Sequence, residues 1–124
     1  MPYAMKWEDG GVHIEFQSHV TGKEIKQAGD AVYGNKQFDR IRYQIFDFTD
    51  AVEFKISLDE MKEIAAIDSV AATINSTMRL AIVSNSETID TAIALYDANT
   101  PDSPWTTEGF RSLSEARSWI EVAI

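Results

Sequence analysis

Three short segments of the sequence have the pattern of a capping box, in which a Ser or Thr is followed three residues later by a Glu. They run from Thr21 to Glu24, from Ser57 to Glu60 and from Ser112 to Glu115. In a capping box the hydroxyl accepts a hydrogen bond from a free amide of the first helical turn, and the Glu returns a bond to the backbone of the capping residue. A fourth segment, Ser84 to Glu87, has the same spacing. The sequence therefore predicts helices that begin at defined places along the chain.

Strand-like segments lie before and between these helix starts. Residues 3–8 and 12–16 are expected to pair as a hairpin, because the segment from Asp9 to Gly11 between them suits a tight turn. Further strands are predicted at 41–48, 79–84 and 109–113. The first of these is expected to end around Asp47.

Two segments require a choice between interpretations. Residues 52–58 alternate apolar and polar side chains, which fits either a short strand or a loop pinned to the core, and we interpret them as a loop. Residues 79–84 are almost continuously apolar, which is typical of a strand covered on both faces. We predict that they form the central strand.

The predicted helices are amphipathic. In the first, Ile25, Ala28 and Val32 have the spacing of a buried stripe, and the helix is expected to end near Tyr33, with Gly34 or Asn35 in the left-handed conformation. The second is expected from about residue 58 to residue 76, either continuous or broken at 68–69. Two shorter helices are expected around 89–96 and 116–123.

The order of these elements indicates an α/β fold. An initial hairpin followed by strand–helix units, joined by right-handed crossovers, produces a mixed, mostly parallel sheet with packed helices. A chain of 124 residues has the usual size of one domain, so we expect residues 1–124 to form a single domain.

Composition excludes several classes of function. The chain has no cysteine, so disulfides, thiolate metal sites and cysteine nucleophiles are excluded. Its net charge is −9, and residues 80–110 contain five acidic residues and no Lys or Arg. Such a charge disfavours nucleic acids and anionic membrane surfaces as partners. With no leader sequence and no apolar stretch long enough to cross a bilayer, a cytoplasmic protein without membrane insertion is expected.

Two segments resemble the SpoIIAA-like proteins, small bacterial relatives of the STAS domain. The strand at 79–83, Arg-Leu-Ala-Ile-Val, is similar to the basic-apolar strand of that family. The ending at 110–120 is similar to its Phe-containing strand followed by a Glu-Ala-x-x-Trp helix. The resemblance implies a SpoIIAA/STAS-like fold and a regulatory, protein-binding role without catalysis.

The resemblance also draws attention to Ser57. In phosphorylatable STAS regulators a serine lies at the start of the second helix, after a strand end that Asp47 to Thr49 resembles, and Ser57 occupies a similar place. A phosphate there would face free amides and the positive end of the helix dipole, with Asp59 and Glu60 opposing it. The same position suits an ordinary helix cap, which is our preferred interpretation of Ser57.

Catalytic and metal sites are not expected. His13 and His19 are the only histidines, too few for a three-histidine metal site, and no serine lies in a nucleophile elbow. A receiver-type role for Asp47 would need paired carboxylates at a strand end and a downstream lysine, which the pattern does not supply. We predict no catalytic residue, no metal and no cofactor.

Two functional hypotheses follow. The first is a non-enzymatic regulatory or protein-interaction module, whose partner binds a surface formed by residues near the end of the predicted strand and the start of the second helix: Asp47, Asp50, Ser57, Asp59 and Met61. The second is a carrier of a lipid or other small apolar ligand, held between helices and covered by Trp105 in its proline-bounded loop. Burial of Trp105 as an anchor of that loop is the interpretation that we favour for this residue. A homodimer through an exposed early strand remains open.

Overall fold

The computed structural model describes residues 3–123, which form a five-stranded mixed sheet in the order β1-β2-β3-β4-β5. β1 (Tyr3–Glu8) pairs antiparallel with β2 (Gly11–Thr21), through a turn in which Gly10 has a φ of 83°. The remaining neighbours are parallel: β3 (Tyr43–Lys55), β4 (Arg79–Val83) and β5 (Thr106–Phe110). The predicted amino-terminal hairpin and mostly parallel sheet are confirmed.

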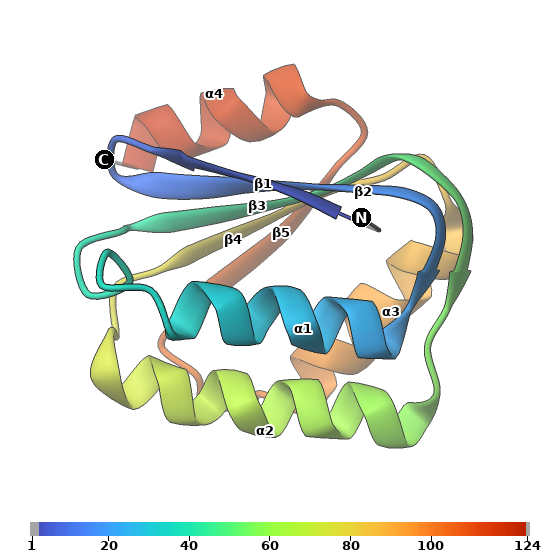
Figure 1. Cartoon of the computed structure of the whole chain (residues 1–124), viewed down its shortest axis with the longest axis horizontal. Coiled ribbons are helices and arrows are strands. Elements are labelled where there is room, and N and C mark those ends of the chain that lie inside the picture. The colour runs from blue at the N-terminus through green and yellow to red at the C-terminus, as the bar shows by residue number, and fades with distance from the viewer. Residues whose placement is uncertain (1–2, 124) are drawn as a thin grey trace.

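Helices cover both faces of this sheet (Figure 1). α1 (Gly22–Tyr33), α2 (Leu58–Ile74) and α3 (Glu87–Ala98) lie on one face, and α4 (Leu113–Ala123) lies on the other. The predicted α/β fold with packed helices is therefore correct.

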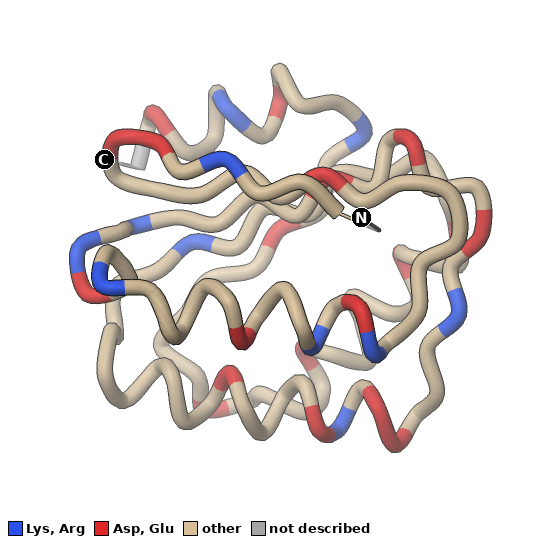
Figure 2. Tube along the Cα trace, in the orientation of Figure 1, with Lys and Arg blue, Asp and Glu red and all other residues tan. Residues whose placement is uncertain are grey.

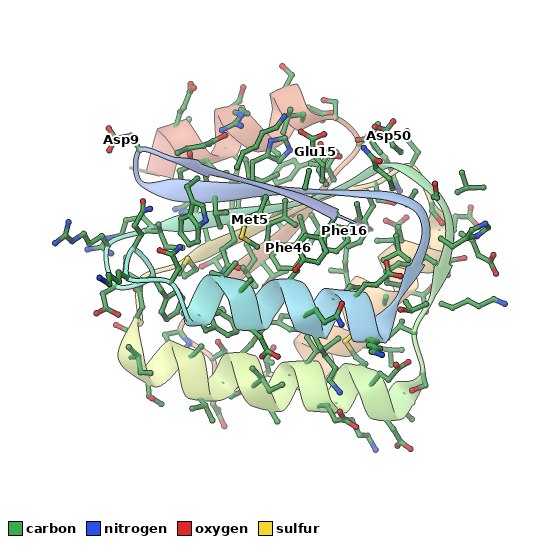
Figure 3. The ribbon with its side chains drawn as sticks, viewed as in Figure 1. Met5, Asp9, Glu15, Phe16, Phe46 and Asp50 are labelled. Carbon is green, nitrogen blue, oxygen red and sulfur yellow. The ribbon has the colours of Figure 1, made fainter. Side chains whose placement is uncertain are left out.

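The alternation of side chains along the strands produces two cores. On β2 and β3, Phe16 and Phe46 point toward α1, whereas Glu15 lies on the side of α4 (Figure 3). The larger core fills the space between the sheet and α1 to α3, and the smaller one packs Ile45 and Ala81 under α4. The predicted stripe of α1, with Ile25, Ala28 and Val32, is buried in the larger core.

The structure corrects the prediction for residues 52–58. Residues 52–55 belong to β3, which continues to Lys55, and only residues 56 and 57 form the connection to α2. Asp47 therefore lies within β3 rather than at its end. The reason is a long-range partner, because β2 extends to Thr21 and pairs with β3 along residues 50–55. This two-stranded extension projects beyond the point where β4 stops, since Val83 pairs with Asp47.

The choice of central strand was also wrong. β3 occupies the centre of the sheet, and β4 lies between β3 and β5. β4 is nevertheless an interior strand with helices over both faces, which explains its continuous apolar run.

Most helix starts follow the capping pattern. The amide of Glu24 donates to the Thr21 hydroxyl, and the amide of Glu115 donates to Ser112. The Ser84 to Glu87 pattern is different: α3 is capped by Ser86, and the Ser84 hydroxyl accepts a hydrogen bond from the amide of Ser86.

Helix ends were less predictable. α2 runs unbroken through Asp68 and Ser69 to Ile74, so the continuous alternative holds. Gly34 closes α1 with a φ of −81°, not in the left-handed region, while its amide donates to the carbonyl of Asp30.

Candidate functional site

Three helix starts meet at one edge of the sheet. Each of α1, α2 and α3 follows the carboxyl end of a parallel strand, so their first turns lie along the same edge (Figure 1). In open α/β sheets, small ligands bind outside the carboxyl ends of the strands. We call it the carboxyl edge.

Ser57 forms a complete capping box at the start of α2. The Ser57 hydroxyl accepts a hydrogen bond from the Glu60 amide at 3.0 Å, and the Glu60 carboxylate accepts one from the Ser57 amide at 2.9 Å. Ser57 is exposed. Its hydroxyl therefore caps the helix while remaining accessible from solvent.

The Glu60 carboxylate also contacts the start of α1. A Cβ atom added to Gly22 would lie 2.7 Å from Cδ of Glu60, which is closer than carbon atoms approach. The Glu60 carboxyl group thus occupies the space beside Gly22 as it turns back toward Ser57. One carboxylate joins two helix starts at the carboxyl edge.

The residues after Ser57 divide between surface and interior. Asp59 is exposed in the first turn of α2, as is half of the Leu58 side chain, whereas Met61 is 6% exposed and faces the core. Met61 therefore cannot belong to a binding surface in this conformation, which corrects its place in the predicted set.

Asp47 is buried as well. Its Oδ2 lies 3.0 Å from Nε2 of His13 on β2, and its Oδ1 accepts hydrogen bonds from the amide and the hydroxyl of Thr49, at 3.0 and 2.5 Å. Burial favours a higher pKa for Asp47, but the hydrogen bonds from Thr49 and His13 outweigh it and lower the pKa. Asp47 is a charged group inside the sheet layer on the side of α4, not a surface acid.

Asp50 lies on the extension of β2 and β3 and is exposed (Figure 3). Close by along the same strand, the Val52 side chain is 82% exposed. No hydrogen bond or ion pair of the described residues joins Asp50 or Asp47 to Ser57. Of the predicted surface residues, Asp50, Ser57 and Asp59 are therefore exposed, whereas Asp47 and Met61 are buried.

Charge at the carboxyl edge is mainly negative. Figure 2 shows acidic residues in the first turns of α1 and α2, and α3 also begins with Glu87 and Asp90. Lys55 is engaged by Glu53 at 2.9 Å. A phosphate on Ser57 would therefore gain from the helix dipole and meet repulsion from Asp59 and Glu60.

Trp105 does not cover a pocket between helices. It is 7% exposed, its indole nitrogen donates to the carbonyl of Asn75 at 2.7 Å, and its ring packs against Phe38 and Tyr33. It anchors the loop before β5 to the core. The prediction that Trp105 covers a pocket is wrong, because its loop folds inward at the carboxyl-terminal end of α2, which is the end far from Ser57.

An ion-pair cluster ties α4 to the hairpin. The Arg117 guanidinium donates to both carboxylate oxygens of Glu8 at 2.6 Å, and the Tyr43 hydroxyl donates to Glu8 at 2.5 Å. The hydrogen bonds from Arg117 lower the pKa of Glu8, and burial together with Glu8 raises the pKa of Tyr43 to about 12. These contacts are structural, since they are satisfied within the chain.

Sequence reasoning missed a half-buried polar group that joins α1, α2 and α3. Asp68 of α2 accepts hydrogen bonds from Tyr33 of α1 and from Tyr96 of α3, the latter at 2.7 Å. Burial raises the pKa of Asp68 to about 6, although the tyrosine hydroxyls act in the opposite direction. The available signal was Asp68 within the mostly apolar stretch 64–74 of α2, where an acid suggested only a break in the helix.

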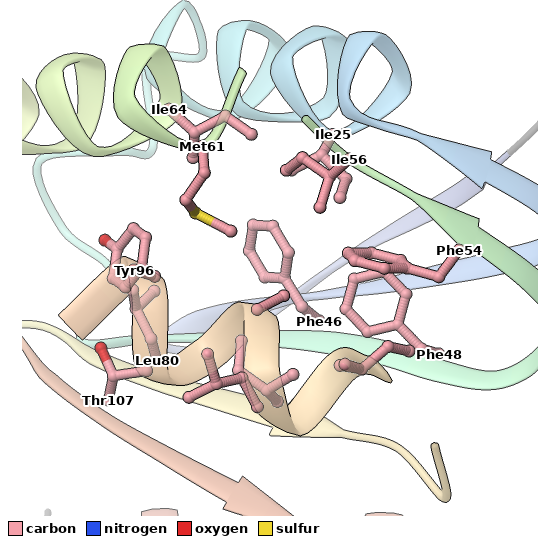
Figure 4. A pocket seen from close by; sticks show the side chains of 14 residues that line it. Ile25, Phe46, Phe48, Phe54, Ile56, Met61, Ile64, Leu80, Tyr96 and Thr107 are labelled. Atoms are coloured by element: carbon pink, nitrogen blue, oxygen red, sulfur yellow. The ribbon is translucent and has the colours of Figure 1, made fainter. Parts of the chain in front are cut away.

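A pocket between helices was one of the two hypotheses from the sequence, which did not indicate the residues that form its walls. A cavity of about 70 Å³ lies between the sheet, α2 and α3 (Figure 4). Met61 and Phe46 are among the labelled side chains that surround it. It opens toward a groove bordered by Ser57.

Residues 3–123 contain no cluster of three or more His, Asp or Glu side chains placed to hold a metal ion. Nor does any helix within that range have the length and apolar character needed to span a bilayer.

Comparisons with known proteins show the fold. No protein-family model matches the sequence, and no curated protein matches it either. Among solved structures, unphosphorylated SpoIIAA, described as an anti-sigma factor antagonist, aligns with a TM-score of 0.62 and 10% identity, over 98% of this chain and 99% of its own.

Two further structures agree. Phosphorylated SpoIIAA, described as a Bacillus cell fate determinant, gives a TM-score of 0.54 at 12% identity, over 95% of this chain and 98% of its own. An uncharacterised DUF3478-family protein from Shewanella loihica PV-4 gives 0.57 at 12% identity, over 94% of this chain and 90% of its own. The chain has the SpoIIAA-like fold.

Proposed function

We propose that this chain is a non-enzymatic regulatory module of the STAS-like class that binds a protein partner at the carboxyl edge. The binding surface comprises the exposed residues of that edge and of the adjoining extension: Asp50, Val52, Ser57, Leu58 and Asp59. We call this set the edge surface. The proposal extends to this chain the regulatory role named for SpoIIAA, whose fold it shares.

The observation that carries the proposal is the exposure of apolar side chains beside charged ones. Val52 is 82% exposed and Leu58 is 51% exposed, next to Asp50 and Asp59. A contiguous exposed apolar patch rimmed by polar residues marks a protein-binding surface, and we propose that Val52 and Leu58 belong to such a patch. The acids would favour a partner with a basic surface.

In this surface Ser57 caps the start of α2, and a phosphate added to its exposed hydroxyl would alter partner binding. A dianion at this position adds repulsion against Asp59 and Glu60 and changes the charge that the partner meets. The SpoIIAA structures include a phosphorylated form, which is consistent with such a switch in proteins of this fold.

Partner affinity tests the proposal. The partner is captured from the cells that make the protein, purified, and titrated with wild type and with Val52→Ser and Leu58→Ser. Each substitution is expected to weaken binding at least tenfold. Val122→Ser is the matched control, because Val122 is 89% exposed on α4, away from the edge surface. The proposal would be contradicted if Val52→Ser and Val122→Ser lost equal affinity for the partner, or if neither edge variant lost any.

A further inference from the structure

The cavity between the sheet, α2 and α3 is lined mainly by apolar side chains. The sheet supplies Phe46 and Leu80, α2 supplies Met61 and Ile64, and α3 supplies Ala92 (Figure 4). Protein interiors rarely keep voids larger than one water molecule. At about 70 Å³, this space is several times the roughly 10–15 Å³ that one water needs on the same measure.

The cavity has a path to solvent. An open groove shares Phe54, Ile56 and Ala92 with it and reaches the surface beside Ser57 and Thr88. A molecule at this groove would meet polar side chains at the mouth and only carbon-lined walls further in. The arrangement fits a ligand with one polar end and one apolar end.

The lining also defines what the deep part can accept. Its hydroxyl groups belong to Tyr96 and Thr107, and the Tyr96 hydroxyl already donates to Asp68. A polar group pushed into the cavity would lose water without gaining a full set of partners, which is unfavourable. Met61 adds a flexible side chain that can adapt to different apolar shapes.

We infer that this cavity binds the alkyl chain of a small single-chain amphiphile, with the polar end of the ligand in the groove near Ser57. Such a site agrees with the second hypothesis from the sequence, a carrier of a small apolar ligand. The residues that line it could not be identified from the sequence. It goes beyond the proposed function and does not rest on it, because it involves no protein partner.

A nuclear magnetic resonance titration of the full chain with 1-octanol tests the inference. The methyl signals of Met61, Ile64, Ile82 and Ile89 are expected to shift with saturation, since these residues line the cavity. Shifts confined to the exposed methyl groups of Ile67 and Val70 on the outer side of α2, or no saturable shift, would overturn it.

A matched pair of variants on α3 locates the site. Ala92 is buried and lines both cavity and groove, so Ala92→Leu places three added carbons where the ligand would lie. It is expected to weaken 1-octanol binding at least tenfold. Ala94→Leu makes the same change at an exposed position of the same helix and is expected to leave binding unchanged. Unchanged affinity in Ala92→Leu would contradict the inference.

A second variant keeps the test decisive if Ala92→Leu does not fold. Met61→Ala enlarges the cavity and requires no larger side chain to fit. It is expected to bind the bulkier probe 2-naphthol at least tenfold more tightly than wild type does. Equal affinities of Met61→Ala and wild type for 2-naphthol would overturn the site. Both titrations use the isolated protein, so their failure is distinct from a failure to bind a partner.

Discussion

At the scale of single residues, buried polar groups are the least predictable part of this chain. His13 and Asp47 are 34 residues apart in sequence and meet only because β2 and β3 pair in register. Asp68 similarly joins side chains from α1 and α3. Nothing local in the sequence encodes these contacts, whereas the capping role of Ser57 depends on four consecutive residues and is confirmed.

Asp68 leads to a pH prediction. Its pKa is about 6 in the folded protein, above the ordinary value of 3.8, so between these pH values the folded state holds a proton that the unfolded state has released. The contribution of Asp68 to stability therefore falls as the pH rises from about 4 to about 6 and stays low above that.

The variant Asp68→Asn isolates this effect. The free energy of unfolding of wild type minus that of Asp68→Asn is expected to decrease by about 2 kcal/mol between pH 4.5 and pH 7.5. Urea denaturation at a series of pH values measures it. A difference that stays constant, or that grows with pH, would show that Asp68 is not held at a raised pKa. Glu121→Gln, at an exposed position of α4, serves as the control.

At the scale of elements, helix starts were predicted well and strand ends poorly, for one physical reason. A capping box satisfies backbone amides within one turn, so its pattern is complete in the local sequence. The end of β3 depends on where β2 still offers a partner, and the alternation of residues 52–58 is the same in a strand and in a pinned loop. The loop interpretation failed at that point.

The junction of α1 and α2 gives a prediction at this scale. Ala normally stabilises a helix relative to Gly by about 1 kcal/mol. At Gly22 the added Cβ would collide with the Glu60 carboxyl group, so Gly22→Ala is expected to destabilise the protein instead. In a Glu60→Ala background the same change should become neutral or stabilising, with a coupling of about 1 kcal/mol or more.

Gly29→Ala is the matched control on α1. A Cβ there meets its nearest atom, on Tyr33, at 3.6 Å, an ordinary contact distance. It is expected to be neutral or stabilising in both backgrounds. Thermal and urea unfolding of wild type, Glu60→Ala, and each glycine variant in both backgrounds would settle the sign. Additive effects of Gly22→Ala and Glu60→Ala would mean that the Glu60 carboxylate does not join the two helix starts.

At the scale of the whole molecule, the helices of residues 3–123 cover the two faces of the sheet, and its carboxyl edge is the site that we propose for a partner. One of these helices, α4, is fastened to the hairpin through Arg117 and Glu8. The alternation of strands and helices was enough to predict this architecture. The residues of the proposed edge surface could be predicted only in part. Asp47 and Met61 were expected at the surface but are buried, whereas Val52 and Leu58 are exposed and were not expected there.

The most direct measurement is site-specific crosslinking in the cells that make the protein. A photo-reactive amino acid is placed at position 58 in the edge surface and, in a separate variant, at position 122 on α4, both exposed. The account predicts one defined covalent protein adduct from position 58 and none from position 122. The absence of an adduct at position 58, or the same adduct from both positions, would contradict the proposal that this chain binds its partner at the carboxyl edge.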